Sequence, residues 1–135
     1  MKCGKGFVLT VRPKRILVVE DEALILMATL DMLRELGHEP LPARCAGAAI
    51  ALQEKGMVDA LLTDVNLPDM DGQLLAAELR RRNPGLPIVF ATGYRLNLAD
   101  AVAAGGPTAV LSKPYRTRDL ADALRKVLGS ATAEA

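Results

Sequence analysis

The regular alternation of short apolar runs with longer stretches of helical spacing is the feature that most constrains how this chain can fold. Four runs of mainly aliphatic residues have the length of buried strands: 16–19, 60–63, 88–91 and 108–111. Another segment, 39–43, makes a poor strand because Pro40 and Pro42 lack an N–H, so we expect it at a sheet edge. Strands that alternate with helices predict an α/β fold with a parallel sheet.

The helical stretches between these runs carry leucines at spacings that bring them to one face. We expect an alanine-rich helix over 46–55 and a third helix with Asp71 as its N-cap. The helix expected over 98–104 is the weakest, because only Leu98 and Val102 are large apolar anchors. The leucine and valine anchors expected in the core are Leu26, Leu30 and Leu33; Leu74, Leu75 and Leu79; and Leu120, Leu124 and Val127.

The composition argues against several classes of function. The 17 basic and 16 acidic residues leave a net charge of +1, which argues against a protein that coats nucleic acid. Aromatic residues make up 3% of the chain and tryptophan is absent, which argues against a flavin or base-stacking site. One histidine and two cysteines cannot form a four-ligand zinc site without carboxylates. The chain therefore reads as one domain with an aliphatic core.

The domain organisation follows from the same patterns. No apolar run approaches the length that spans a bilayer, and no signal-peptide core is present, so we expect a cytoplasmic protein without a membrane partner. We expect a flexible basic extension over 1–14, a single domain over 15–129 and a disordered tail over 130–135. Within the extension, the apolar stretch 7–11 could add a strand or contact another subunit.

Two conspicuous features receive a structural interpretation. The single histidine, His38, follows a helical pattern, and we expect it to be an exposed connector residue. The strongest basic run, 80–82, lies at the end of a predicted helix, where cations complement the helix dipole. We therefore do not interpret this run as a nucleic-acid site.

Polar side chains follow the predicted strands at the point where each strand ends. Right-handed crossovers bring the carboxyl ends of parallel strands to one edge of the sheet, where ligands of open α/β sheets bind. The residues expected at that edge are Glu20, Asp21, Asp64, Thr92 and Lys113. Three acids, one hydroxyl and one ammonium should therefore converge there.

This cluster of acids requires a cation. Two carboxylates about 4 Å apart repel by roughly 4 kcal/mol at an effective dielectric constant near 20. An all-oxygen site suits Mg²⁺, which takes protein carboxylates together with phosphate oxygens. We expect Glu20 and Asp21 to hold the metal, with the backbone carbonyl of Asn66 completing the coordination. Taken alone, Asp21 could equally cap the following helix.

A metal-bound phosphoryl group would need a nucleophile and charge-stabilising donors. Asp64 is the best candidate nucleophile, because a carboxylate can form an aspartyl phosphate and its strand should lie between those ending at Asp21 and Thr92. Lys113 would supply a positive charge to the phosphoryl oxygens, and Thr92 a hydroxyl hydrogen bond. Individually each residue has a common structural explanation; jointly they predict phosphoryl chemistry.

The motifs that carry these residues resemble the receiver domain of two-component response regulators. The matching segments, in order, are 16–22 (ILVVEDE), 62–72 (LTDVNLPDMDG), 91–93 (ATG) and 112–114 (SKP). The resemblance covers about 15–128. It implies a flavodoxin-like, doubly wound sheet of five strands in the order 2-1-3-4-5, with helices on both faces. It also implies that Asp64 accepts a phosphoryl group from a histidine kinase and that Glu20 and Asp21 bind the metal. Thr92 and Lys113 would sense the phosphate, and the Lys113–Pro114 bond would be cis.

A five-residue string further resembles a receiver subgroup. The string FATGY at 90–94 marks receivers that are often single-domain and paired with HWE-type kinases. Such a chain would signal by protein contact or pass its phosphoryl group to a histidine phosphotransfer partner. We expect a monomer or a weak dimer; in the family, dimers form through the fourth helix, fifth strand and fifth helix.

The chain departs from the family pattern in two places. Family members carry an aromatic residue three positions before the lysine, and this chain has Val110 there. Since Gly93 loosens the neighbouring loop, we hypothesise that phosphorylation instead orders 92–105, with Tyr94 as the moving ring. Glu20 replaces the more common Asp, and its extra methylene group would shift metal contact toward a water-bridged one.

Two other functions remain open on the sequence. Asp64-Val65-Asn66 is close to the Asp-x-Asp start of haloacid-dehalogenase-like phosphatases, but Asn66 cannot act as their acid/base. A pseudo-receiver would bind a partner without being phosphorylated. The presence of the acids, Thr92 and Lys113 argues against this second alternative. We expect a receiver that catalyses its own phosphorylation and dephosphorylation and is not a turnover enzyme.

Overall fold

Five parallel strands form one sheet in the order β2-β1-β3-β4-β5, as the resemblance implied. The computed structural model describes residues 13–129; the expected extension up to residue 12 and the tail from residue 130 lie outside that range. The strands are β1 (Arg15–Val19), β2 (Glu39–Ala43), β3 (Ala60–Asp64), β4 (Ile88–Thr92) and β5 (Thr108–Ser112). The helices are α1 (Ala23–Glu35), α2 (Ala46–Lys55), α3 (Gly72–Arg82), α4 (Asp100–Ala104) and α5 (Thr117–Leu128).

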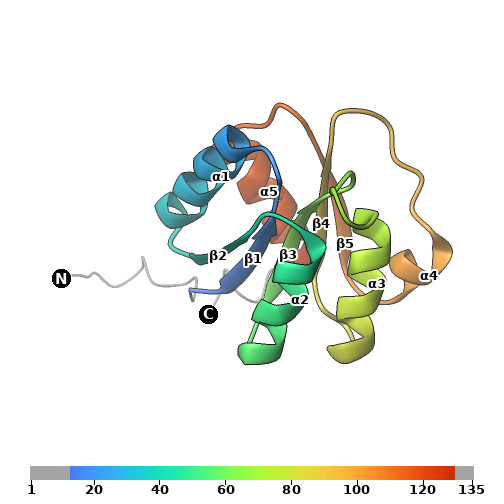
Figure 1. Cartoon of the computed structure of the whole chain (residues 1–135). Helices are drawn as coiled ribbons and strands as arrows, with labels where there is room; N and C mark the ends of the chain where they lie inside the picture. Colours follow the sequence, from blue (N-terminus) through green and yellow to red (C-terminus); the bar gives the residue numbers. More distant parts are fainter. Residues whose placement is uncertain (1–12, 130–135) are drawn as a thin grey trace.

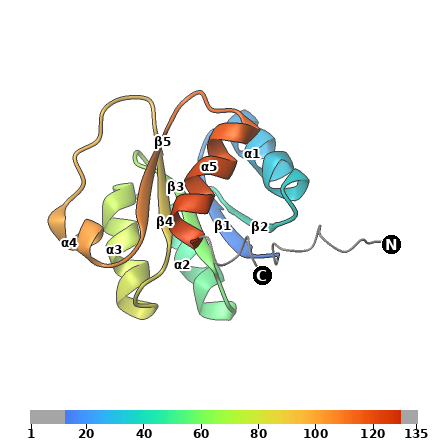
Figure 2. The same cartoon turned by 180° about the vertical axis from the view of Figure 1, so that it is seen from behind.

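Helices cover both faces of the sheet (Figures 1 and 2). α1 and α5 lie on one face, and α2, α3 and α4 lie on the other. Successive residues of β1 point to opposite faces: Leu17 and Val19 join the apolar cluster beneath α2 and α3, while Ile16 and Val18 join the cluster beneath α1 and α5. The proline-containing strand β2 lies at the sheet edge, as predicted. No helix within 13–129 is both long and apolar enough to cross a bilayer.

Two of the predicted helix details are wrong. Leu74 is 63% exposed, because the face of α3 that meets the sheet is formed by Leu75, Ala76 and Leu79. α4 begins at Asp100 rather than residue 98, because Ala99 has extended backbone dihedrals. Leu98 therefore lies ahead of the helix, although it still packs against the core as a half-buried residue.

The prediction for His38 needs a correction as well. His38 lies in the connection between α1 and β2, but it is half-buried rather than exposed. Its Nδ1 accepts a hydrogen bond of 3.1 Å from the backbone N–H of Lys14, and Lys14 in turn leads into β1. Burial lowers the pKa of the His38 imidazole, and the charge of Lys14 lowers it further.

Candidate functional site

The carboxyl edge of the sheet brings the predicted site residues together. Glu20 follows β1, Asp64 ends β3, Thr92 ends β4, and Lys113 follows β5. The Lys113 Nζ donates to Glu20 Oε1 at 2.9 Å and lies 3.2 Å from Asp64 Oδ2. A single ammonium group therefore joins the acids of two strands, although these residues are far apart in sequence.

The acids form a cluster that fits a hard divalent cation. Glu20, Asp21 and Asp64 each offer a carboxylate oxygen, and these oxygens all lie within 4.8 Å of one another. Glu20 is 3% exposed and Asp64 9%, while Asp21 is the most exposed of the three acids. A set of oxygen donors of this kind is what Mg²⁺ prefers. Asp21 does not cap α1, since Glu22 is the N-cap residue and makes no side-chain cap bond.

Burial and pairing shift the pKa values at this site. Burial raises the pKa of the Glu20 carboxyl group, and the hydrogen bonds from Lys113 and from the Glu22 N–H offset only part of that effect. Burial acts to lower the pKa of the Lys113 amine, but Glu20 and Asp64 outweigh it and raise the pKa above its ordinary value. Lys113 is therefore held as a cation between two acids.

The loop after β3 fixes the position of Asp64. The backbone N–H of Asn66 donates to Asp64 Oδ1 at 3.2 Å, which orients the carboxylate. The loop turns back so that the N–H of Gly72 donates to the Val65 carbonyl at 2.6 Å, and Asp71 caps α3 through the Gln73 N–H as predicted. The start of α3 is thereby attached directly to the end of β3.

Of the predicted switch residues, Tyr94 contacts the hydroxyl of Thr92. Thr92 is buried, and its Oγ1 accepts a hydrogen bond of 3.3 Å from the Tyr94 N–H. The Tyr94 ring is exposed, yet its hydroxyl accepts a 2.7 Å hydrogen bond from Asn66 Nδ2. Gly93 is exposed and its Cα faces open space. Val110 lies on the edge strand β5, opposite Phe90 of β4, and is 44% exposed.

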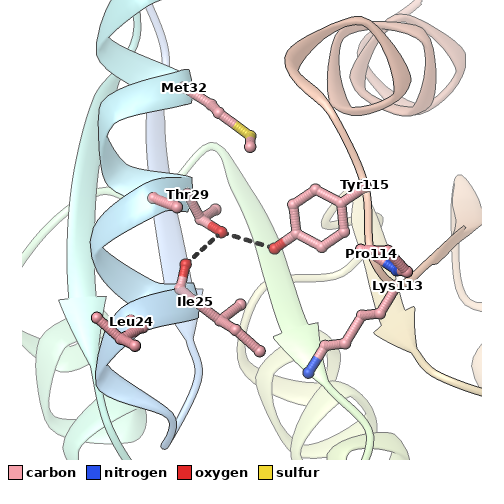
Figure 3. Close-up of a pocket in the computed structure, with 8 residues that line it drawn as sticks. Leu24, Ile25, Thr29, Met32, Lys113, Pro114 and Tyr115 are labelled. Atoms are coloured by element: carbon pink, nitrogen blue, oxygen red, sulfur yellow. Dashed lines mark hydrogen bonds between the residues drawn. The ribbon is translucent and has the colours of Figure 1, made fainter.

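A hydrogen bond that the sequence analysis missed anchors the loop after Lys113. The Lys113–Pro114 peptide bond is cis, as the resemblance implied. The hydroxyl oxygen of Tyr115 lies 2.6 Å from Thr29 Oγ1, within hydrogen-bonding distance (Figure 3). The Thr29 hydroxyl also donates to the Ile25 carbonyl. Thr29 is a polar residue on the apolar face of α1. A hydroxyl at such a position needs a hydrogen-bond partner, and this requirement is the sequence signal from which the contact could have been predicted.

The basic run at the end of α3 is not a uniform surface patch. Arg81 and Arg82 pair with Glu78, and Arg82 also reaches Glu54. Arg80 instead turns inward and is 6% exposed. Arg80, and also Gln73 of the same helix, reach across to the α4 region with side chains that were not predicted to be functional.

The chain resembles known proteins over nearly its full length. The response regulator receiver domain family matches residues 16–125. The transcriptional regulatory protein PdtaR of Mycobacterium tuberculosis is 36% identical over 114 residues, covering 83% of this chain and 55% of PdtaR. The sensor kinase CckA of Brucella abortus is 31% identical over 116 residues, covering 84% of this chain and 12% of CckA. The chain thus spans about half of one relative and a small part of the other.

Solved structures agree with the fold. A CheY-like response regulator receiver domain protein from Methanospirillum hungatei has a TM-score of 0.75 and 30% identity, covering 89% of this chain and 97% of that one. The response regulator TrrA of Thermotoga maritima, solved in complex with Mg²⁺ and BeF, has a TM-score of 0.75 and 28% identity, covering 85% and 99%. Together with the strand-end acids, threonine and lysine, these matches show that the chain belongs to the response regulator receiver domain family of two-component systems.

Proposed function

We propose that this receiver accepts a phosphoryl group on Asp64 from the phosphohistidine of a sensor kinase. The observation that carries the proposal is the position of the Lys113 amine, which lies between Glu20 and Asp64 at the open edge of the sheet. A phosphoryl group on Asp64 would meet a cation already in place. It would signal by a changed protein contact or by onward transfer to a histidine phosphotransfer partner.

The transfer is a substitution at phosphorus. An Asp64 oxygen forms the new O–P bond while the N–P bond of the donor breaks, and the electron pair stays on the imidazole nitrogen, which takes up a proton. Lys113 and the Thr92 hydroxyl stabilise the phosphoryl oxygens. The groups that would hold Mg²⁺ are the carboxylates of Glu20, Asp21 and Asp64 and the backbone carbonyl of Asn66. When bound, the metal neutralises negative charge on the transferred group.

A groove beside the site is the surface we propose for the phosphodonor. Its volume is about 460 Å³, and it lies between α1 and the loop of Lys113 and Tyr115 (Figure 3). Leu24, which lines this groove, is 82% exposed and offers an apolar side chain of α1 to a partner. A helix of the donor packed there would bring its histidine to the edge where Asp64 lies. An HWE-type kinase, as the FATGY string suggests, is the partner we propose.

The alternatives predict different products. A receiver carries one phosphoryl group and is not a turnover enzyme, whereas an aspartyl phosphatase would turn over phosphate esters. A pseudo-receiver would not be modified. We propose that the chain acts as a monomer or weak dimer with the receiver as its working unit.

The test is the intact mass after incubation with acetyl phosphate and Mg²⁺. We expect the wild type to gain one labile phosphoryl group, the Asp64→Asn variant to gain none, and Asp31→Asn to behave as the wild type. Asp31 is the matched control, because it is an exposed aspartate of α1 that forms an ion pair with Arg34 and lies outside the acid cluster. Steady release of phosphate from an ester would favour the phosphatase, and an unmodified wild type would favour the pseudo-receiver.

A further inference from the structure

Arg44 is a cation at the carboxyl edge of the sheet that the sequence analysis did not assign to the site. It is the first residue after β2, so the topology that brings Glu20 and Asp64 to this edge brings Arg44 there as well. Its Nη2 atom donates a hydrogen bond of 2.8 Å to the backbone carbonyl of Asp21. Asp21 is the most exposed of the three acids in the cluster. Arg44 therefore lies beside the acid that solvent reaches most easily.

The segment that carries Arg44 is also attached to the loop that follows β3. Asp69, in that loop, accepts a hydrogen bond of 2.9 Å from the backbone N–H of Ala46 and one of 3.0 Å from that of Gly47. These bonds lower the pKa of the Asp69 carboxyl group, and they cap the first turn of α2, whose own N-cap residue makes no side-chain cap bond. The chain around Arg44 is thus held from the β1 side and from the β3 side of the site.

The charge of Arg44 is not neutralised by a neighbour. Arg44 is exposed, and no carboxylate within 13–129 forms an ion pair with its guanidinium. Its hydrogen bond goes to a neutral carbonyl group, which leaves the positive charge in place. A guanidinium stays protonated at all physiological pH values and offers several N–H groups in one plane, a geometry that matches phosphate oxygens. Arg44 can therefore hold the Asp21 carbonyl and bind an anion at the same time.

Arg44 changes the charge balance at this edge of the sheet. The three ionised acids and Lys113 leave the cluster with a net negative charge, which a divalent cation would only bring to neutrality. A phosphodonor is an anion, and a neutral site gives it no long-range attraction. The additional cation at Arg44 makes the metal-loaded edge positive. The same charge repels the metal ion, so Arg44 acts in opposite directions on the two ligands of the site.

We propose that Arg44 is a specificity-determining residue of the phosphorylation site, which attracts an anionic phosphodonor and weakens the binding of Mg²⁺. Its guanidinium binds an oxygen of the donor as the donor approaches the edge of the sheet. This inference rests on the proposed phosphorylation of Asp64. A purely structural role would give another pattern. Loss of the bond to the Asp21 carbonyl would loosen the loop that carries this acid, and both Mg²⁺ binding and phosphorylation would become weaker.

Two measurements on Arg44→Gln in the full chain separate these roles. The first is a titration with MgCl₂ at constant ionic strength, followed by NMR through the shift of the Asn66 amide. We expect the variant to bind Mg²⁺ about threefold more tightly than the wild type. The second is the initial rate of labelling by acetyl phosphate, measured by intact mass at Mg²⁺ concentrations that saturate both proteins. We expect labelling to be about threefold slower in the variant, and the difference to disappear in about 1 M NaCl, where charges are screened.

The matched control is Arg34→Gln, which removes the same charge from the last turn of α1, whereas the acid cluster lies at the start of that helix. We expect this control to match the wild type in both measurements, and Arg44→Lys, which keeps the charge, to be labelled at close to the wild-type rate.

Two results would overturn the proposal. Arg44→Gln could bind Mg²⁺ more weakly and be labelled more slowly, which is the structural pattern, or it could match the wild type in both measurements. Failure of acetyl phosphate to label the wild type would overturn the proposed function instead. The Mg²⁺ titration needs no phosphoryl transfer, so it would still decide whether the charge of Arg44 acts on the acid cluster.

Discussion

Gly72 occupies a point in the structure where no side chain fits. A Cβ atom there would lie 2.2 Å from the Asp64 carbonyl oxygen and 2.8 Å from the Val65 Cα, and both are backbone atoms that cannot turn aside. The close approach is what allows α3 to begin directly beside the phosphoacceptor loop. Glycine is required here for space, since its φ is not in the left-handed region.

We predict that Gly72→Ala lowers the free energy of unfolding by about 3 kcal/mol, because overpacking against backbone forces the loop to shift. Gly93→Ala is the matched control. Its Cβ would meet nothing within 4 Å, so we expect its stability to stay within about 0.5 kcal/mol of the wild type. Urea denaturation of the three proteins measures this, and equal midpoints for both variants would contradict the explanation.

The residues of the site differ in how far the sequence could predict them. Glu20, Asp64 and Lys113 could be predicted, because a parallel sheet brings the carboxyl ends of its strands together whatever lies between them. Arg80 could not be distinguished from its basic neighbours by composition. Its position one helical turn after Ala76 places it on the face of α3 that the structure buries.

At the scale of elements, the connection between α1 and β2 is joined to the start of β1 through His38. The Nδ1 atom of His38 must be unprotonated to accept the Lys14 N–H. Burial lowers the pKa of this imidazole in the folded chain, so the unfolded chain binds the proton more tightly. The contribution of His38 to stability is therefore present above about pH 6.5, the ordinary histidine value, and is lost as the pH falls below it.

We predict that the difference in stability between wild type and His38→Gln shrinks between pH 7.5 and pH 5.5. Glutamine does not titrate, and the comparison cancels the other ionisable groups that both proteins share. Urea midpoints at the two pH values provide the measurement. A difference that is the same at both pH values would show that the protonation of His38 has no part in holding β1.

Elements could be predicted from the sequence to the extent that their own residues stabilise them. The bounds expected for α2 match the structure, and the buried residues of α5 include each anchor that the leucine spacing predicted. α4 was placed too early because its limits depend on Gln73 and Arg80, which belong to another helix. The periodicity of one segment carries no information about side chains of another helix that contact it.

At the scale of the whole molecule, the acid cluster exists only when the sheet is complete. Glu20 and Asp21 follow β1, and Asp64 ends β3, so the unfolded chain has no such site. A cation that binds the cluster therefore binds only the folded state and stabilises the whole domain.

We predict that Mg²⁺ raises the melting temperature, with a gain of about 1.4 kcal/mol when its concentration is tenfold above the dissociation constant. Asp21→Asn removes one acid of the cluster and should lose most of this gain, whereas Asp31→Asn should keep it. Thermal unfolding with MgCl₂, compared with NaCl at equal ionic strength, measures the effect. An equal gain in Asp21→Asn would place the cation elsewhere.

The sheet separates the groove along α1 from α4, because α1 lies on one face and α4 on the other (Figures 1 and 2). A protein bound along α1 and a protein bound to α4 would therefore contact opposite faces of the domain. If the phosphodonor binds along α1 as proposed, it does not have to leave before a second protein binds α4. Under that proposal, the time the receiver spends on its donor does not limit when its opposite face becomes accessible.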